Sequence, residues 1–326
     1  MKKISGAGLG LHILEVEITN RCNLNCKHCY NRDYQIQDLP LQDIKELIDL
    51  AQKNKVSKFV FSGGEAALHP KFTEISKYLK TIQGETKFIV QSNGYIANVP
   101  IEIIKAFNVV HLSFEIDDDC GVRKISIQDT TSLAKRLMQS GIYTYFFATV
   151  HTGNIGHIDR LVSLANNCGI DIGFNLCLSV KHHDNLSLSE TQRIAVIRKL
   201  HDLYQQKKIL RFSSPFVSIL ENKKSIPYNG NKGGCTAGIA ACVVLPNGDV
   251  CPCPFFRIKA GNVYEEPFEK IWMESDTFKE LRKRYLFDEP CGSCEFLSYC
   301  SGCRARAFKE TGKLTGADPE CVKHKL

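Results

Sequence analysis

The sequence predicts an α/β fold in which a parallel sheet is followed by a small cysteine-rich domain. Six β-rich runs alternate with amphipathic stretches over residues 14–180, and this alternation implies right-handed βαβ crossovers and a parallel sheet. Nine of the 15 cysteines lie in residues 235–326, where the segments are short and rich in turns. A region with so little continuous apolar pattern needs metal to hold it together. We therefore expect a core over residues 1–185, a helical and linker segment over 186–234 and a metal-binding domain over 235–326.

The individual elements follow from local patterns. The predicted strands are β-branched and aromatic runs over residues 14–19, 58–62, 87–91, 109–115, 143–149 and 171–178. Helices are predicted over residues 41–54, 72–83, 130–140 and 155–168, because apolar residues there keep helical spacing. Ser189 is placed to cap a further helix that runs to about residue 206. Asn247 and Gly248, between two apolar runs, predict a β-hairpin in the C-terminal region.

The composition excludes several classes of protein. Hydrophobic residues make up 43% of the chain and charged residues 24%, which is ordinary for a soluble globular protein. No apolar run approaches the roughly 18 residues of a membrane helix, and we find no signal peptide, so a cytoplasmic protein without a membrane partner is expected. The formal net charge is +7 when every cysteine is counted as neutral. If cysteine thiolates bind three iron–sulfur clusters, the net charge falls to roughly +2. Because Lys and Arg are also scattered, we expect no nucleic-acid partner.

Three cysteines directly follow the first predicted strand. Cys22, Cys26 and Cys29 fall within eight residues, and a loop of this size can wrap three corners of a cubic iron–sulfur cluster and leave the fourth iron open. The odd number of cysteines and their tight spacing favour metal ligands over disulfides. A loop after a strand of a parallel sheet lies where such sheets carry their chemistry. A zinc site built from the same thiols is the alternative.

The CxxxCxxC motif at Cys22, Cys26 and Cys29, together with the Gly-Gly-Glu turn at 63–65, resembles the radical S-adenosylmethionine (radical SAM) enzymes over residues 12–180. The resemblance implies a partial (β/α)6 TIM-like barrel and a [4Fe-4S] cluster whose open iron binds S-adenosylmethionine. Reductive cleavage of that molecule would give a 5′-deoxyadenosyl radical. His28 takes the aromatic-type position before the last cysteine. Ala66 stands where the family often has proline.

The resemblance also assigns cofactor-binding positions. Gly63 and Gly64 would let the backbone approach the methionine portion, and the Glu65 carboxylate would receive its ammonium group. The remaining positions, at the ends of later strands, would face the ribose and the carboxylate of the cofactor. They are Asn93, Ser113 and Glu115, with Asn154 as a further guess for adenine. Many relatives have aspartate in place of Glu115, and ordinary polar strand ends are the alternative for each of these residues.

The C-terminal cysteines resemble the SPASM extension, which carries auxiliary iron–sulfur clusters. The resemblance implies two auxiliary [4Fe-4S] clusters. Cys235, Cys253 and Cys303 would bind the first, with Cys242 as a possible fourth ligand in competition with Cys251. The second would be bound by Cys291, Cys294, Cys300 and Cys321. Cys303 follows Cys300 after two residues rather than the family's three, and a pair of zinc ribbons is the alternative.

Three further cysteines, Cys120, Cys168 and Cys177, lie outside both groups. A buried cysteine is usually a small hydrophobe, but a donor of a hydrogen atom to a substrate radical must be a cysteine or a similar group. Candidates for that catalytic role are Cys177, Cys120 and Cys251, the last if Cys242 is the ligand. The ten histidines show no ligand spacing, and we expect them at the surface.

The favoured function is an enzyme that abstracts a hydrogen atom from an unactivated carbon. Relatives with this architecture mostly modify ribosomally made peptides or proteins by crosslinks, thioethers or epimerisation, so a peptide or protein substrate is expected. The chain begins almost at the first strand, which suggests that a separate recognition protein binds the leader. Flavodoxin or ferredoxin would supply the electron.

Two other functions stay open. The run from Cys300 to Ala307 resembles the C-termini of tetrapyrrole-modifying members, which decarboxylate side chains in haem synthesis. Arg304 and Arg306 in that run do not by themselves indicate carboxylate binding, because exposed helix arginines are the commoner case and are expected here. A non-catalytic iron–sulfur electron-transfer protein is a different class, and it predicts no cleavage of S-adenosylmethionine.

Overall fold

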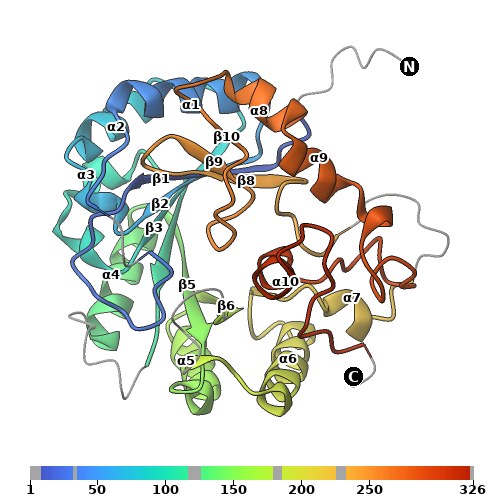
Figure 1. Ribbon diagram of the computed structural model, residues 1–326. Helices are drawn as coiled ribbons and strands as arrows, with labels where there is room; N and C mark the ends of the chain where they lie inside the picture. The colour runs from blue at the N-terminus through green and yellow to red at the C-terminus, as the bar shows by residue number, and fades with distance from the viewer. Residues whose placement is uncertain (1–8, 32–34, 117–125, 179–185, 225–232, 324–326) are drawn as a thin grey trace.

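One sheet runs through the chain from its first strand to its cysteine-rich end. The computed structural model describes residues 9–31, 35–116, 126–178, 186–224 and 233–323. Its ten strands follow the order β10-β9-β8-β1-β2-β3-β4-β5-β6-β7. The strands curve inside an arc of helices, and the C-terminal segments close the remaining side (Figure 1). The expected α/β fold with a parallel sheet is confirmed.

All six predicted strands are present and are parallel to their neighbours. They are β1 Ile13–Thr19, β2 Lys58–Gly63, β3 Lys87–Ser92, β4 Val109–Ser113, β5 Tyr143–Val150 and β6 Asp171–Leu176. β4 ends two residues earlier than predicted, which leaves Glu115 in the loop beyond it. A short seventh strand, β7 Arg211–Ser213, continues the parallel order after β6.

The C-terminal region adds three strands to the open side of β1. β8 Ala241–Val244 pairs in parallel with β1, and the antiparallel β9 Asp249–Cys251 completes the predicted hairpin. β10 Gly261–Asn262 pairs with β9. The Trp272 indole N–H also donates a 2.7 Å hydrogen bond to the Leu9 carbonyl. The cysteine-rich region therefore shares backbone pairing with the core.

The helices pack their apolar faces on the outside of the sheet. The long ones around the core are α1 Leu41–Lys53, α2 Phe72–Leu79, α4 Ile127–Gln139, α5 Ile158–Asn167 and α6 Glu190–Gln205. α1 buries Ile44, Leu47, Ile48 and Ala51, the face that its spacing predicted. Ser189 caps α6 in a reciprocal capping box with Gln192, also as predicted. Within the described ranges, no helix is long and apolar enough to cross a bilayer.

Alternation along the strands separates this apolar core from a polar inner face. Leu14, Val16 and Ile18 of β1 are fully buried in the core. Glu15 and Glu17 point to the opposite side, because successive side chains of a strand alternate. The remaining helices are α3 Ile101–Ile104 and α7 Val217–Leu220 beside the core, and α8 Phe268–Glu274, α9 Asp276–Arg282 and α10 Arg304–Thr311 after it.

Candidate active site

The first cysteine loop leaves the carboxyl end of β1 and is anchored there by Asp38. The Thr19 hydroxyl donates to Asp38 at 2.6 Å, and Arg21 Nε lies 3.0 Å from both carboxylate oxygens. Two backbone N–H groups point at thiols within the loop, from Leu24 to Cys22 and from Asn31 to Cys29, each at 3.4 Å. Such bonds favour the thiolate, which is the form that binds metal.

The Gly-Gly-Glu turn lies directly against the backbone that enters this loop. The Gly64 N–H donates to the Thr19 carbonyl at 2.8 Å, and the Glu65 N–H donates to the Arg21 carbonyl at 2.7 Å. A Cβ on Gly63 would come within 1.9 Å of the Thr19 oxygen, and one on Gly64 within 2.2 Å of the Arg21 oxygen. Glycine is therefore required at both positions by the chain's own backbone. Sequence reasoning had related them only to the cofactor.

Glu65 ties the ends of three strands together. Its carboxylate accepts the Asn93 N–H at 2.7 Å and the Ala67 N–H at 3.4 Å. Only 1% of its surface is exposed, and this burial raises the pKa of Glu65 to about 7. The Asn93 amide in turn donates to Asn23 at 2.9 Å and reaches the Cys22 sulfur at 3.6 Å. The ends of β1, β2 and β3 thus converge on the first cysteine loop.

His28 connects the loop to the ends of β4 and β5. Its Nε2 lies 3.5 Å from a Glu115 carboxylate oxygen, and the other Glu115 oxygen accepts the Thr149 N–H at 3.0 Å. The rings of His28 and His151 are 5.5 Å apart. His28 Nδ1 is buried and has no hydrogen-bond partner among the residues that the structure describes. A polar atom buried in this way fits a site that receives a polar ligand.

Cys177 lies beside the same carboxylate. Burial raises the pKa of Cys177 to about 12, and the Glu115 charge contributes to the shift. Its backbone N–H donates to the Val150 carbonyl at 2.8 Å, beyond the end of β6. Ser113 ends β4 and is half-buried. The side chain of Asn154 bonds to the backbone of Thr149 and His151, both at 2.8 Å, so it shapes that loop.

The C-terminal thiols form two groups, which we call the first and second thiol groups. In the first group, burial raises the pKa of Cys253, and the thiols of Cys235 and Cys303 raise it further. In the second, burial raises the pKa of Cys300 to about 12, with contributions from Cys321 and Cys291. Cys294 also acts on the pKa of Cys291. The two ligand sets that the family pattern implies stay a prediction.

Cys242 and Cys251 are the two remaining cysteines of the C-terminal region. They stand on neighbouring strands β8 and β9, and both are buried. Burial raises the pKa of Cys242, Arg282 opposes this shift, and Cys251 adds to it. Cys251 has Asp249, Arg257 and Glu17 as charged neighbours. Cys120 falls outside the described residues, and Cys168 follows α5 in a half-buried position.

The first cysteine loop and the two thiol groups have the ligand chemistry that iron–sulfur clusters require. Every set consists of thiols, and backbone N–H groups bond to them, as from Gly302 to Cys300 at 3.3 Å. Across the described ranges, no group of three or more His, Cys, Asp or Glu side chains is arranged to hold a metal ion.

A buried polar cluster on the inner face was missed from the sequence. Ser62 donates to Glu15 at 2.7 Å, and Arg257 pairs with the fully buried Glu17 at 2.6 Å. The Tyr30 ring contacts Phe255 edge-on, with centroids 4.7 Å apart. Two acidic residues in alternate positions of an otherwise apolar strand were the available signal.

The opposite wall of the inner face is aromatic. The His111 ring stacks on Tyr145 at 4.9 Å and meets Phe147 edge-on at 4.6 Å. The guanidinium of the exposed Arg211 lies 5.1 Å from the centre of the Phe147 ring. Burial, and then the Arg211 charge, lower the pKa of His111 to about 3, so this ring is neutral.

Two expectations about exposure are wrong. Arg304 and Arg306 are 1% and 4% exposed, because the small domain closes around α10. Arg304 donates to the carbonyls of Leu314 and Gly316, and Arg306 pairs with Asp318. Several histidines are also buried rather than at the surface, namely His69, His111 and His151.

Comparison with known families explains this arrangement. Residues 16–165 match the family model of the radical SAM superfamily, and residues 235–295 match SPASM, an iron–sulfur cluster-binding domain. The chain belongs to the radical SAM superfamily. The C-terminal match gives it a SPASM domain, as the cysteine spacing implied. Both assignments support an iron–sulfur cluster and S-adenosylmethionine as cofactors of this radical SAM enzyme.

Relatives with different names resemble the radical SAM chain to similar degrees. The AdoMet-dependent heme synthase of Methanosarcina barkeri is 27% identical over 94% of this chain and 95% of its own length. Mycofactocin maturase MftC of Mycobacterium tuberculosis is 28% identical over 94% of this chain and 81% of its own. Streptococcus suis SuiB, solved with its precursor peptide SuiA, superimposes with a TM-score of 0.78 at 18% identity, covering 97% of this chain and 76% of SuiB. At that identity the likeness to SuiB shows the fold.

Proposed function

We propose that this radical SAM enzyme modifies a ribosomally made peptide or protein, by a crosslink, a thioether or an epimerisation. The observation that carries the radical chemistry is the convergence of Glu65, Asn93 and His28 on one three-cysteine loop. When bound, a [4Fe-4S] cluster with S-adenosylmethionine would supply the radical chemistry that abstracts hydrogen from an unactivated carbon. Cys22, Cys26 and Cys29 would hold that cluster.

The residues around the loop would orient the cofactor. Glu65 bonds to Asn93, which in turn bonds to Asn23 of the loop, and its carboxylate would receive the ammonium group. His28 and Glu115 would bind the ribose of the cofactor, and a polar atom of the ribose would pair with the buried His28 Nδ1. Cys177, whose pKa responds to Glu115, would return a hydrogen atom from its sulfur to a substrate radical.

The two thiol groups support two auxiliary [4Fe-4S] clusters. The first group supplies three thiols, with Cys242 as the proposed fourth ligand and Cys251 left as a second hydrogen-donor candidate. The second group supplies four. Such clusters suit a net oxidation, because they can accept the electron left after a bond forms. We expect flavodoxin or ferredoxin as the electron donor and a separate recognition protein for the peptide leader.

A peptide substrate is supported by the maturase named among the relatives and by the fold shared with a peptide-bound enzyme. Tetrapyrrole side-chain decarboxylation is the second candidate, and the full-length match to a heme synthase favours it. The residues of α10 do not favour a tetrapyrrole substrate. Arg304 and Arg306 are buried and bonded within the domain, so they do not present a carboxylate site.

The test is anaerobic reconstitution followed by reduction with S-adenosylmethionine present. About twelve irons per chain and release of 5′-deoxyadenosine are expected. Replacing Cys22, Cys26 and Cys29 by alanine should abolish that product, and its persistence would sink the mechanism. Mass spectrometry should then separate the substrates. A peptide encoded beside the enzyme would lose two hydrogens or exchange one with solvent, whereas a propionate-bearing tetrapyrrole would lose carbon dioxide.

A further inference from the structure

The short link between Cys300 and Cys303 has an unusual backbone. Its two residues, Ser301 and Gly302, both adopt left-handed conformations, with φ of +63° and +61°. Ser301 is strained there, because a Cβ disfavours this region. The two cysteines that flank the link belong to different thiol groups. The left-handed turn thus separates the groups in spite of the missing third residue.

Asp318 holds this turn from the other side. Its carboxylate accepts the Cys303 N–H at 2.6 Å. A Cβ on Gly302 would lie 2.5 Å from the Asp318 Cβ, so the glycine is needed for this approach. Asp318 also bonds through its backbone to the Cys291 thiol. One residue therefore touches the first thiol group at Cys303 and the second at Cys291.

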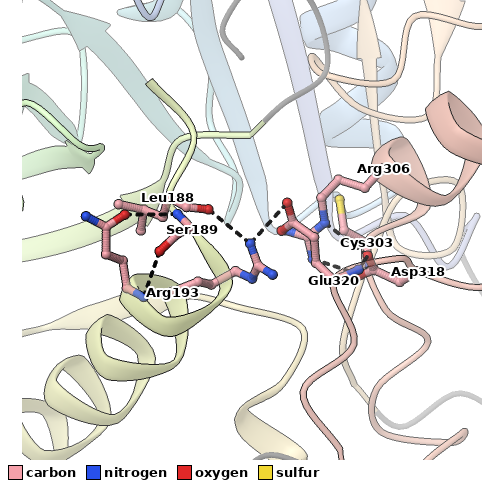
Figure 2. A network of polar contacts seen from close by, with 8 residues as sticks. Leu188, Ser189, Arg193, Cys303, Arg306, Asp318 and Glu320 are labelled. Atoms are coloured by element: carbon pink, nitrogen blue, oxygen red, sulfur yellow. Dashed lines mark hydrogen bonds and ion pairs between the residues drawn. The ribbon is translucent and has the colours of Figure 1, made fainter. Parts of the chain in front are cut away.

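Arg306 fixes the Asp318 carboxylate in place. Its Nε and Nη2 donate to the two carboxylate oxygens at 3.1 and 2.7 Å, and both residues are 4% exposed. Figure 2 shows the pair beside Cys303, with Glu320 next to it. Glu320 lies 2.8 Å from Arg306 Nη1 and 3.3 Å from Arg193 Nη1, which belongs to α6. The same arginine thus meets two carboxylates, of which Asp318 alone receives the Cys303 N–H.

We propose that Asp318, held by Arg306, is a positioning residue that directs Cys300 and Cys303 into separate auxiliary clusters across a link shortened by one residue. This inference rests on the proposed pair of auxiliary clusters. An ion pair that only stabilised the domain would not decide which thiol joins which group. The distinction is measurable as iron content and as the spectrum of the reduced clusters.

The experiment uses full-length protein in which Cys22, Cys26 and Cys29 are alanine, so that iron reports on the auxiliary sites alone. This background should bind about eight irons per chain. Adding Asp318→Asn should lower the number to about four and change the electron paramagnetic resonance spectrum of the reduced protein. Glu320→Gln is the matched control, because it removes an equal charge from Arg306 without touching Cys303. It should keep about eight irons.

A rescue separates positioning from folding. One glycine inserted between Gly302 and Cys303 restores the family spacing, and Asp318→Asn in that longer chain should again bind about eight irons. Failure of this rescue, equal losses in the Asp318 and Glu320 variants, or an unchanged Asp318→Asn variant would each overturn the inference. A background that binds far fewer than eight irons would instead overturn the proposed pair of clusters.

Discussion

Arg257 donates a 2.6 Å hydrogen bond to Glu17, although 240 positions separate the two residues. Glu17 is fully buried on β1, whereas Arg257 lies four residues after Cys253. The guanidinium also lies 5.3 Å from the centre of the Tyr30 ring, next to Cys29. This ion pair therefore connects β1, which leads into the first cysteine loop, with the segment that follows Cys253 of the first thiol group.

Removing Arg257 should destabilise the whole protein. Arg257→Gln takes away the cation that faces a buried carboxylate, so we expect the free energy of unfolding to fall by about 3–5 kcal/mol. The double variant with Glu17→Gln should recover part of that loss. Anaerobic urea unfolding measures both. Lys199→Gln, which breaks an exposed pair with Asp159, should cost less than about 1 kcal/mol. A double variant no more stable than Arg257→Gln would show that pairing is not the cause.

Substitution of the turn glycines should disable the first cluster specifically. A Cβ at Gly64 meets the Arg21 carbonyl at 2.2 Å, so Gly64→Ala must push the cysteine loop away from the turn. Iron should drop from about twelve to about eight per chain, and 5′-deoxyadenosine should disappear. Gly156→Ala is the control, because its Cβ would meet nothing within 4 Å. Full iron content in Gly64→Ala would contradict this account.

Glu15 should make stability depend on pH near neutrality. Burial raises the pKa of Glu15 from 4.5 to about 7, against the opposing hydrogen bond from Ser62. The folded state therefore keeps a proton that the unfolded chain releases in this interval. The stabilisation that this proton gives is fully present below pH 4.5 and is lost as pH rises through 7. The loss lowers the free energy of unfolding by at most about 3 kcal/mol.

Glu15→Gln removes that titration. The free energy of unfolding of this variant, relative to the wild type, should therefore rise between about pH 5 and pH 8. Denaturant unfolding at several pH values measures the difference. A difference that stays constant over the interval would show that Glu15 does not keep its proton in the folded state.

Cys177 should matter after radical formation rather than before it. Cys177→Ala removes the thiol beside Glu115 but leaves the cysteine loop intact. The rate of S-adenosylmethionine cleavage should stay within about twofold of the wild-type rate. The yield of a product that needs a returned hydrogen atom should fall at least about tenfold. Solvent deuterium incorporation into that product provides the measurement. Cys168→Ala, a half-buried cysteine at the end of α5, should leave both unchanged.

Local sequence patterns predicted most strands of the sheet, but they did not predict pairing between segments that are far apart in the chain. β1 to β6 and the face of α1 follow from apolar spacing within each segment. The pairing of β8 with β1 joins segments more than two hundred residues apart, and no local pattern marks that partner. β7 was missed because three residues carry too short a pattern to recognise.

The site shows the same division. The cysteine pattern implies two thiol sets through its resemblance to the SPASM family, and these sets stay a prediction. It did not predict that Gly63 and Gly64 pack on Thr19 and Arg21, since the facing backbone comes from another strand. The burial of Arg304 and Arg306 was mispredicted because an eight-residue helix has too little periodicity to show which face is enclosed.

The parallel pairing of β8 with β1 joins the two halves of the protein in one sheet. A chain cut before residue 235 would leave β1 as an unprotected edge with a row of free N–H and C=O groups. Such an edge invites pairing with a second molecule. The strand that leads into the first cysteine loop therefore depends on the C-terminal domain for its edge pairing, and we expect the N-terminal half alone to self-associate.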